Sequence, residues 1–159
     1  MDASSISMYL KETWATIYMT LISSSISYLI GIPLGVILVV TDKDGIHPMT
    51  PVHAVLGMLI NIFRSIPFLI LLVMVLPLTK MLVGTTLGPK AIIPPLIIAS
   101  APYIGRMVES SLKEVNAGVI EAAKSMGATN TQIIFKVLLP EAKPSLLVGA
   151  AICITTILS

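Results

Sequence analysis

The sequence predicts an all-α fold, a polytopic bundle of transmembrane helices. Hydrophobic residues make up 55% of the 159 residues and charged residues only 11%, with a mean hydropathy of +0.96. Soluble domains carry about a quarter charged residues, so this chain has too little charge to cover a surface in water. A formal net charge of +2 does not favour nucleic-acid binding. The single cysteine, Cys153, excludes an internal disulfide and a cysteine-based metal site.

The first apolar stretch, residues 13–41, contains no charged side chain. About 20 such residues cross the hydrocarbon core, so we expect a span over residues 13–40 after an external N-terminal segment, residues 1–12. Gly31 and Gly35 lie in its last third, where they favour a bend or the close approach of a neighbouring helix.

Two further spans are expected over residues 56–78 and 92–108. The second span contains Arg64, about five residues from its start, which is shallow enough for the side chain to snorkel. A functional role for Arg64 stays open because ionisable residues within spans often serve one. Pro94 and Pro95 suit the start of the third span, and Pro102 should kink it.

Arg106 and Glu109 are three residues apart at the end of the third span and can pair on one helix face. Both a structural ion pair and a gate are open interpretations of these two charges. His47 and His53 lie in or beside a loop with no carboxylate or cysteine at metal-ligand spacing, so we predict no metal site.

A fourth apolar stretch, residues 145–159, would extend about 22 Å as a helix. The hydrocarbon core is about 30 Å thick, so we expect the chain to be truncated at its C-terminus. More basic residues lie on the side of the polar section 109–143 than on the other side. This excess predicts that the section is cytoplasmic and that the N-terminus is outside.

The polar section has the signals of two short helices. Asn116 can cap a helix that starts at Ala117, and Gly127 suits a left-handed residue after its end. Thr129 and Gln132 have the spacing of a capping box for a second helix, which Pro140 should limit. The sequence therefore predicts a helix–turn–helix elbow at the membrane surface.

Within this elbow, the spacing of one pattern resembles the signature of ABC importer permeases, the binding-protein-dependent transport system inner-membrane components. The pattern is EAA, three residues, Gly, nine residues and then Ile-x-Leu-Pro, with valine here in place of isoleucine. The matching residues are Glu121, Ala122, Ala123, Gly127, Val137, Leu139 and Pro140. In that family the EAA helix docks on a cytoplasmic ATPase and transmits its closure to the pore, which implies an ATPase-coupling role for these residues. The alternative is a loop that only caps the bundle.

The segments 61–68 and 101–109 look like those of methionine-import permeases. This resemblance implies a homodimer in the bacterial inner membrane that works with two ATPase subunits and an external substrate-binding lipoprotein, and D- or L-methionine as substrate. The chain has no Walker motif, so the resemblance implies that the partner binds ATP and Mg, and that this chain is neither an enzyme nor a cofactor protein. Another small solute remains an alternative substrate. A secondary transporter is disfavoured because residues 13–41 and 45–108 lack Asp and Glu.

Overall fold

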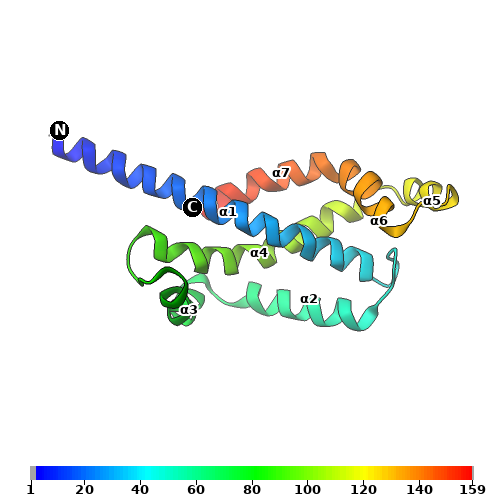
Figure 1. The fold of residues 1–159 in the computed structure, drawn as a ribbon, viewed down its shortest axis with the longest axis horizontal. Coiled ribbons are helices and arrows are strands. Elements are labelled where there is room, and N and C mark those ends of the chain that lie inside the picture. Colours follow the sequence, from blue (N-terminus) through cyan, green and yellow to red (C-terminus); the bar gives the residue numbers. More distant parts are fainter. Residues whose placement is uncertain (1–2, 159) are drawn as a thin grey trace.

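A computed structural model describes residues 3–158, in which all regular structure is helical (Figure 1). The predicted all-α fold is therefore confirmed. In chain order the elements are α1 (Ala3–Thr41), α2 (Thr50–Ser65), α3 (Phe68–Val83), α4 (Pro89–Lys113), α5 (Ala117–Ser125), α6 (Asn130–Ile133), the π-helix η1 (Ile134–Leu138) and α7 (Leu139–Leu158).

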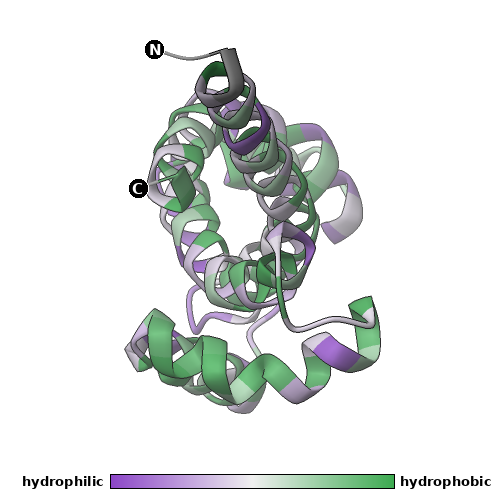
Figure 2. Cartoon of the chain, turned by 90° about the vertical axis from the view of Figure 1, so that its left-hand side faces the viewer, coloured by the Kyte–Doolittle hydropathy of each residue, from purple (hydrophilic) through white to green (hydrophobic). Residues whose placement is uncertain are grey.

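Three continuous helical stretches in the described part of the chain are long and apolar enough to cross a membrane: residues 5–41, 89–113 and 130–158. The pair α2 and α3 passes the same test only together and counts as a fourth if taken as one broken span. Hydrophobic residues occur along all of the long helices (Figure 2), and many of their large side chains are exposed while others are buried inside the bundle. Helices that are apolar all round suit lipid or a further protein surface rather than water.

The expected first span is part of a longer helix. Residues 3–12, which we expect from the sequence to form a separate external segment, instead form the first turns of α1 and extend away from the rest of the bundle (Figure 1). Lys11 and Glu12 are good helix formers, and no glycine or proline interrupts the chain before Gly31. The charged residues Lys11 and Glu12 therefore do not mark the start of this helix.

The expectation of one continuous helix over residues 56–78 is corrected by the structure. α2 ends at Ser65, α3 begins at Phe68, and the two axes differ by 107°. Pro67 explains the break, because a residue before proline is disfavoured in the helical region. Ile66 is accordingly extended, with φ −81° and ψ 122°.

Two other expectations about proline are also corrected. α4 begins at Pro89, which takes the first-turn position favoured for proline, so Pro94 and Pro95 lie inside the helix instead of starting it. Pro140 does not end the second helix of the elbow, since the chain stays helical from Asn130 to Leu158. The wider turn of η1 directly before Pro140 accommodates the ring and the missing N–H, and the Leu139 N–H donates to the Ile134 carbonyl instead.

The bundle is centred on the contact between α1 and α4. Gly31 faces Ile104 and Gly35 faces Val108, and both partner side chains are fully buried. The predicted close approach at these glycines is confirmed. Around it lies a buried cluster shared by α4, η1 and α7, made of Ile104, Val108, Leu112, Leu138, Ala142 and Cys153.

We predict that Gly35→Ala loosens this contact. An added Cβ would lie 2.5 Å from Val108 Cβ and 2.7 Å from the backbone oxygen of Gly105, so the two helices must separate. Overpacking of this kind costs about 1–3 kcal/mol. Thermal unfolding in detergent should show a lower midpoint for Gly35→Ala, whereas Leu29→Ala, at a site 76% exposed on the same helix, should change it little. Equal midpoints in the wild type and Gly35→Ala would contradict the close packing.

Candidate functional site

The elbow between α4 and α7 is built by local capping hydrogen bonds. The Asn116 side chain accepts from the Gly118 N–H at 2.8 Å and starts α5. Thr129 Oγ1 accepts from the Gln132 N–H at 3.4 Å, and Gln132 Oε1 accepts from the Thr129 N–H at 2.9 Å. The predicted N-cap and capping box are confirmed.

Gly127 forms the turn of the elbow in the left-handed region, with φ +79°. The Gly127 N–H donates to the Lys124 carbonyl at 2.9 Å, and the Ala128 N–H donates to the Ala123 carbonyl at 3.1 Å. These bonds satisfy the last carbonyls of α5 in the Schellman arrangement. Because no atom lies within 4 Å of a Cβ built at Gly127, backbone conformation rather than space requires glycine there.

The elbow has a buried side and an exposed side. Ala123, Ile133 and Leu138 are buried and hold it together and against the bundle. Glu121 and Ala122 are exposed. The exposed surface of the elbow also includes the apolar side chains of Val119, Met126 and Phe135.

The second part of the sequence pattern lies where η1 meets α7. Val137 and Leu139 are half-buried and Pro140 is exposed, while Leu138 between them belongs to the central buried cluster. Leu138 occupies the unspecified position of the sequence pattern, and its burial fixes this part of the elbow to α4.

An ion-pair network lies at the same end of the bundle. Glu109 is only 6% exposed and accepts from Arg106 Nη1 at 2.7 Å and from Lys113 Nζ at 2.9 Å. The predicted Arg106–Glu109 pair is confirmed as a contact. Lys113 Nζ also lies 2.7 Å from Asp42 Oδ2, just after α1, and this hydrogen bond holds the pKa of Asp42 below its ordinary value.

Arg106 ties α4 to α2 as well. Its Nη2 donates to the Gly57 carbonyl and to Asn61 Oδ1, both at 3.1 Å. Together with Lys113, this side chain links α4 to the interior of α2 and to the end of α1. Neither interhelical link has a local sequence signal, because the partners lie far apart along the chain.

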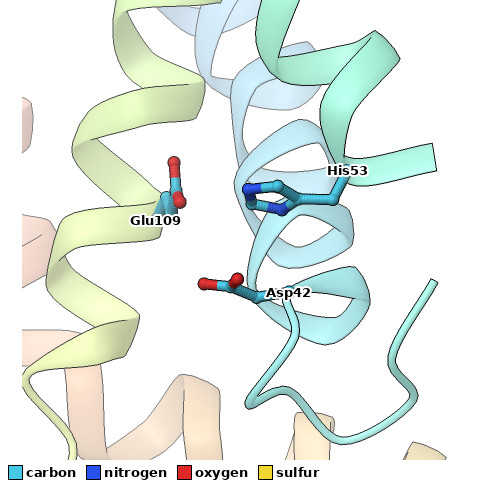
Figure 3. Close-up of side chains that lie close together, drawn as sticks. All are labelled: Asp42, His53 and Glu109. Carbon is cyan, nitrogen blue, oxygen red and sulfur yellow. The ribbon is translucent and has the colours of Figure 1, made fainter. Parts of the chain in front are cut away.

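Asp42, His53 and Glu109 approach one another within this network (Figure 3), with ligand atoms within 4.8 Å. His53 Nδ1 lies 2.9 Å from the Leu38 carbonyl, which only accepts, so Nδ1 carries the proton. Both carboxylates already contact the Lys113 ammonium. Lys113 and Arg106 together balance the charge of these two carboxylates and disfavour a metal ion in the same place. The prediction of no metal site stays a prediction.

Arg64 lies in the last turn of α2 and its side chain is exposed. The shallow position assumed a helix that continues to residue 78, whereas α2 ends one residue after Arg64. The guanidinium carbon of Arg64 lies 5.9 Å from the centroid of the Tyr103 ring. Tyr103 is about 21 Å along α4 from Pro89 and about 15 Å from Lys113, so Arg64 packs beside the middle of a candidate span.

The fold and the elbow define the class of protein. The family described as "Binding-protein-dependent transport system inner membrane component" matches residues 31–159, and the chain belongs to this family. It is a membrane permease subunit of an ABC importer.

Its relatives include permeases named for methionine. The chain is 48% identical over 152 residues to the probable D-methionine transport system permease protein MetI of Vibrio cholerae, which covers 96% of this chain and 68% of that protein. It is 53% identical over 116 residues to the methionine import system permease protein MetP of Bacillus subtilis, covering 73% of this chain and 52% of that protein.

Solved structures show the same fold. The permease chain in an inward-facing structure of the MetNI methionine ABC transporter superposes with a TM-score of 0.97 at 43% identity, covering 99% of this chain and 73% of that one. A chain of an amino acid ABC transporter gives a TM-score of 0.63 at 24% identity, which supports the fold alone.

We predict that Glu109→Ala destabilises the bundle more than the loss of an exposed carboxylate. The substitution leaves Arg106 and Lys113 without their shared, buried acceptor, which should cost about 1–3 kcal/mol. Thermal unfolding in detergent measures the effect, and Glu141→Ala, at an exposed position near the same end, is the control. Identical unfolding of both variants would show that the network does not stabilise the fold.

Proposed function

We propose that this chain imports methionine across the bacterial inner membrane and is driven by a separate ATPase that docks on the elbow. The complete transporter would contain two copies of the permease, two ATPase subunits that bind ATP and Mg, and an external substrate-binding lipoprotein. The observation that carries the docking part is an elbow with a buried structural side and an exposed side around Glu121 and Ala122. The relatives named for methionine support the choice of substrate.

The exposed side of the elbow has the properties of a docking surface. Met126 is 81% exposed and lies directly after α5, and Val119 and Phe135 add further exposed apolar side chains. Ala122 is small and lets a partner approach the α5 backbone, while the Glu121 carboxylate can accept from a cation of the partner. Gly127, Val137, Leu139 and Pro140 would act by fixing the shape and direction of this surface.

Movement of the elbow can reach the membrane helices through α4. Only residues 114–116 separate the end of α4 from α5. Lys113, the last residue of α4, is paired to Asp42 and Glu109, so a displacement of α5 would act on both α4 and the end of α1. A loop that only caps the bundle would need the buried side of the elbow but not its exposed apolar residues.

We predict that Gly127→Val and Glu121→Ala each reduce recovery of the ATPase in a quantitative pull-down and reduce ATP-driven uptake to the same degree. A β-branched residue is strained at φ +79° and would tilt α5. Loss of the Glu121 carboxylate removes a charge-assisted contact worth about 1.5–3 kcal/mol.

The matched control is Gly84→Val. Gly84 also has a positive φ, +80°, with open space around a built Cβ, but it ends α3 instead of α5. Its backbone strain is therefore comparable, while ATPase recovery should be normal. Wild-type recovery and uptake in both elbow variants would refute the docking proposal.

A second prediction concerns orientation. Because the basic residues favour a cytoplasmic elbow, Ser125→Cys should react with an impermeant thiol reagent from the cytoplasm, and Thr85→Cys from outside. Cys153 is buried and is replaced by serine in both variants to remove background. Labelling with the opposite sidedness would overturn the orientation and, with it, docking of a cytoplasmic ATPase.

A third prediction concerns substrate. Methionine should be taken up by the reconstituted transporter and should change its rate of ATP hydrolysis, whereas leucine and glutamine should have little effect. Radiolabelled uptake into proteoliposomes measures this preference. ATP-driven uptake of another solute without methionine uptake would leave the importer class intact and refute the substrate.

A further inference from the structure

A cleft of about 410 Å³ separates the elbow from the loop that joins α1 to α2, residues 42–49. The loop and the elbow lie at the same end of the molecule (Figure 1). One wall of the cleft comes from the loop, and the other comes from Ala117, Ile120 and Lys124 of α5. The ends of α1 and α4 and Leu138 of η1 complete the lining.

The wall formed by the loop is fixed on the end of α1. The His47 N–H donates to the Val40 carbonyl at 3.0 Å. A Cβ added at Gly45 would collide with the carbonyl oxygens of Val39 and Val40, so the chain passes directly over the last turn of α1. Asp44, which precedes this glycine, is therefore carried on a wall that moves with α1.

The opposite wall, α5, is attached to the bundle in a different way. It packs mainly on α6 and η1, and only residues 114–116 join it to α4. Within residues 3–158, no hydrogen bond or ion pair links α5 to the loop. Ile46 of the loop and Ile120 of α5 are half-buried and both pack against the central buried cluster. Closing the cleft would remove more of these two apolar side chains from water, which favours closure.

The charges that line the cleft are matched in sign. Among the described residues they are Asp42, Asp44, Lys113 and Lys124. Asp42 and Lys113 pair at 2.7 Å. Asp44 and Lys124 are exposed, come from opposite walls, and form no ion pair within residues 3–158. Because opposite charges attract, a movement of α5 toward the loop would favour contact between these two side chains.

We propose that Asp44 and Lys124 form a closing ion pair, which holds α5 against the end of α1 in one stage of the transport cycle. This inference rests on the proposed function, in which an ATPase moves the elbow. Lys113 already joins α4 to Asp42, so the closing ion pair adds a direct link from α5 to α1. Exposed ion pairs are weak, which suits a contact that forms and breaks in every cycle.

The first test reverses these charges in the complete transporter in proteoliposomes. Asp44→Lys and Lys124→Glu should each lower the methionine taken up per ATP hydrolysed about two- to fivefold, because like charges then oppose closure. The double variant, which exchanges the two charges, should restore most of this ratio. Lys43→Glu, which reverses an exposed charge beside Asp44 but outside the cleft, should leave it unchanged. Failure of the double variant to restore the ratio would overturn the inference.

A disulfide measures closure without any need for methionine. Asp44→Cys and Lys124→Cys are combined with Cys153→Ser in the permease–ATPase complex and oxidised, and the linked peptides are quantified by mass spectrometry. A disulfide requires Cα atoms within about 7 Å, so its yield should differ several-fold between the nucleotide-free and the vanadate-trapped complex. The linked transporter should lose uptake and regain it on reduction. Equal yields in both states, or no link in either, would refute the closing ion pair.

Recovery of the ATPase in a pull-down separates this inference from the proposed function. Asp44→Lys and Lys124→Glu should recover as much ATPase as the wild type does. If both variants lose the ATPase, the cleft accepts a side chain of the partner, and the closing ion pair is refuted while docking on the elbow stands. If the wild type also recovers no ATPase, the proposed docking fails and this inference fails with it.

Discussion

The close packing of α1 on α4 is the constraint on which the rest of the structure depends. Gly31 and Gly35 have no side chains, so Ile104 and Val108 of α4 fit against the α1 backbone. Where both surfaces are apolar and lipid competes equally well, small residues and dense contact hold helices together. The cluster that joins η1 and α7 to α4 builds on the same stretch of α4, with Leu112, Leu138 and Ala142 extending it toward the elbow.

Ion pairs add polar links between helices to the apolar packing of α1 on α4. Glu109 is buried at the end of this contact and is shared by Arg106 and Lys113, which reach α2 and the end of α1. Ion pairs at the surface contribute little to stability, but a shared, nearly buried carboxylate with two cations fixes geometry. This network lies at the end of α4, just before α5, so the elbow follows directly after a helix whose end is held by ion pairs. A force on the exposed side of the elbow would consequently act on the bundle.

The break at Pro67 sets the position of a different cation, Arg64, which has no ion-pair partner among the described residues. By ending α2 at Ser65 it places Arg64 beside the middle of α4, on the Tyr103 ring and next to a cavity. A continuous helix would have carried Arg64 at a shallow depth, where the side chain could reach the interface. One local feature, the restriction of the residue before proline, therefore decides which part of α4 this exposed side chain lies beside.

The sequence by itself determined the helical class, the short helices of the elbow and their caps. These features depend on composition, on residues a few positions apart and on the conformational preferences of Asn116, Gly127 and Thr129, all of which act locally. The EAA pattern likewise has fixed spacing, and it predicted the family to which the chain belongs. Local signals also gave the Arg106–Glu109 pair, because three residues along a helix bring two side chains to one face.

Only the tertiary structure decided how these parts meet. It divided the second span at Pro67, continued the helix through Pro140 by way of η1, and joined Asp42 to Lys113 from distant parts of the chain. The same is true of the packing of Arg64 on Tyr103. Each of these outcomes depends on which helix lies beside which, and that follows from long-range packing between apolar surfaces, which leaves no fixed spacing in the sequence.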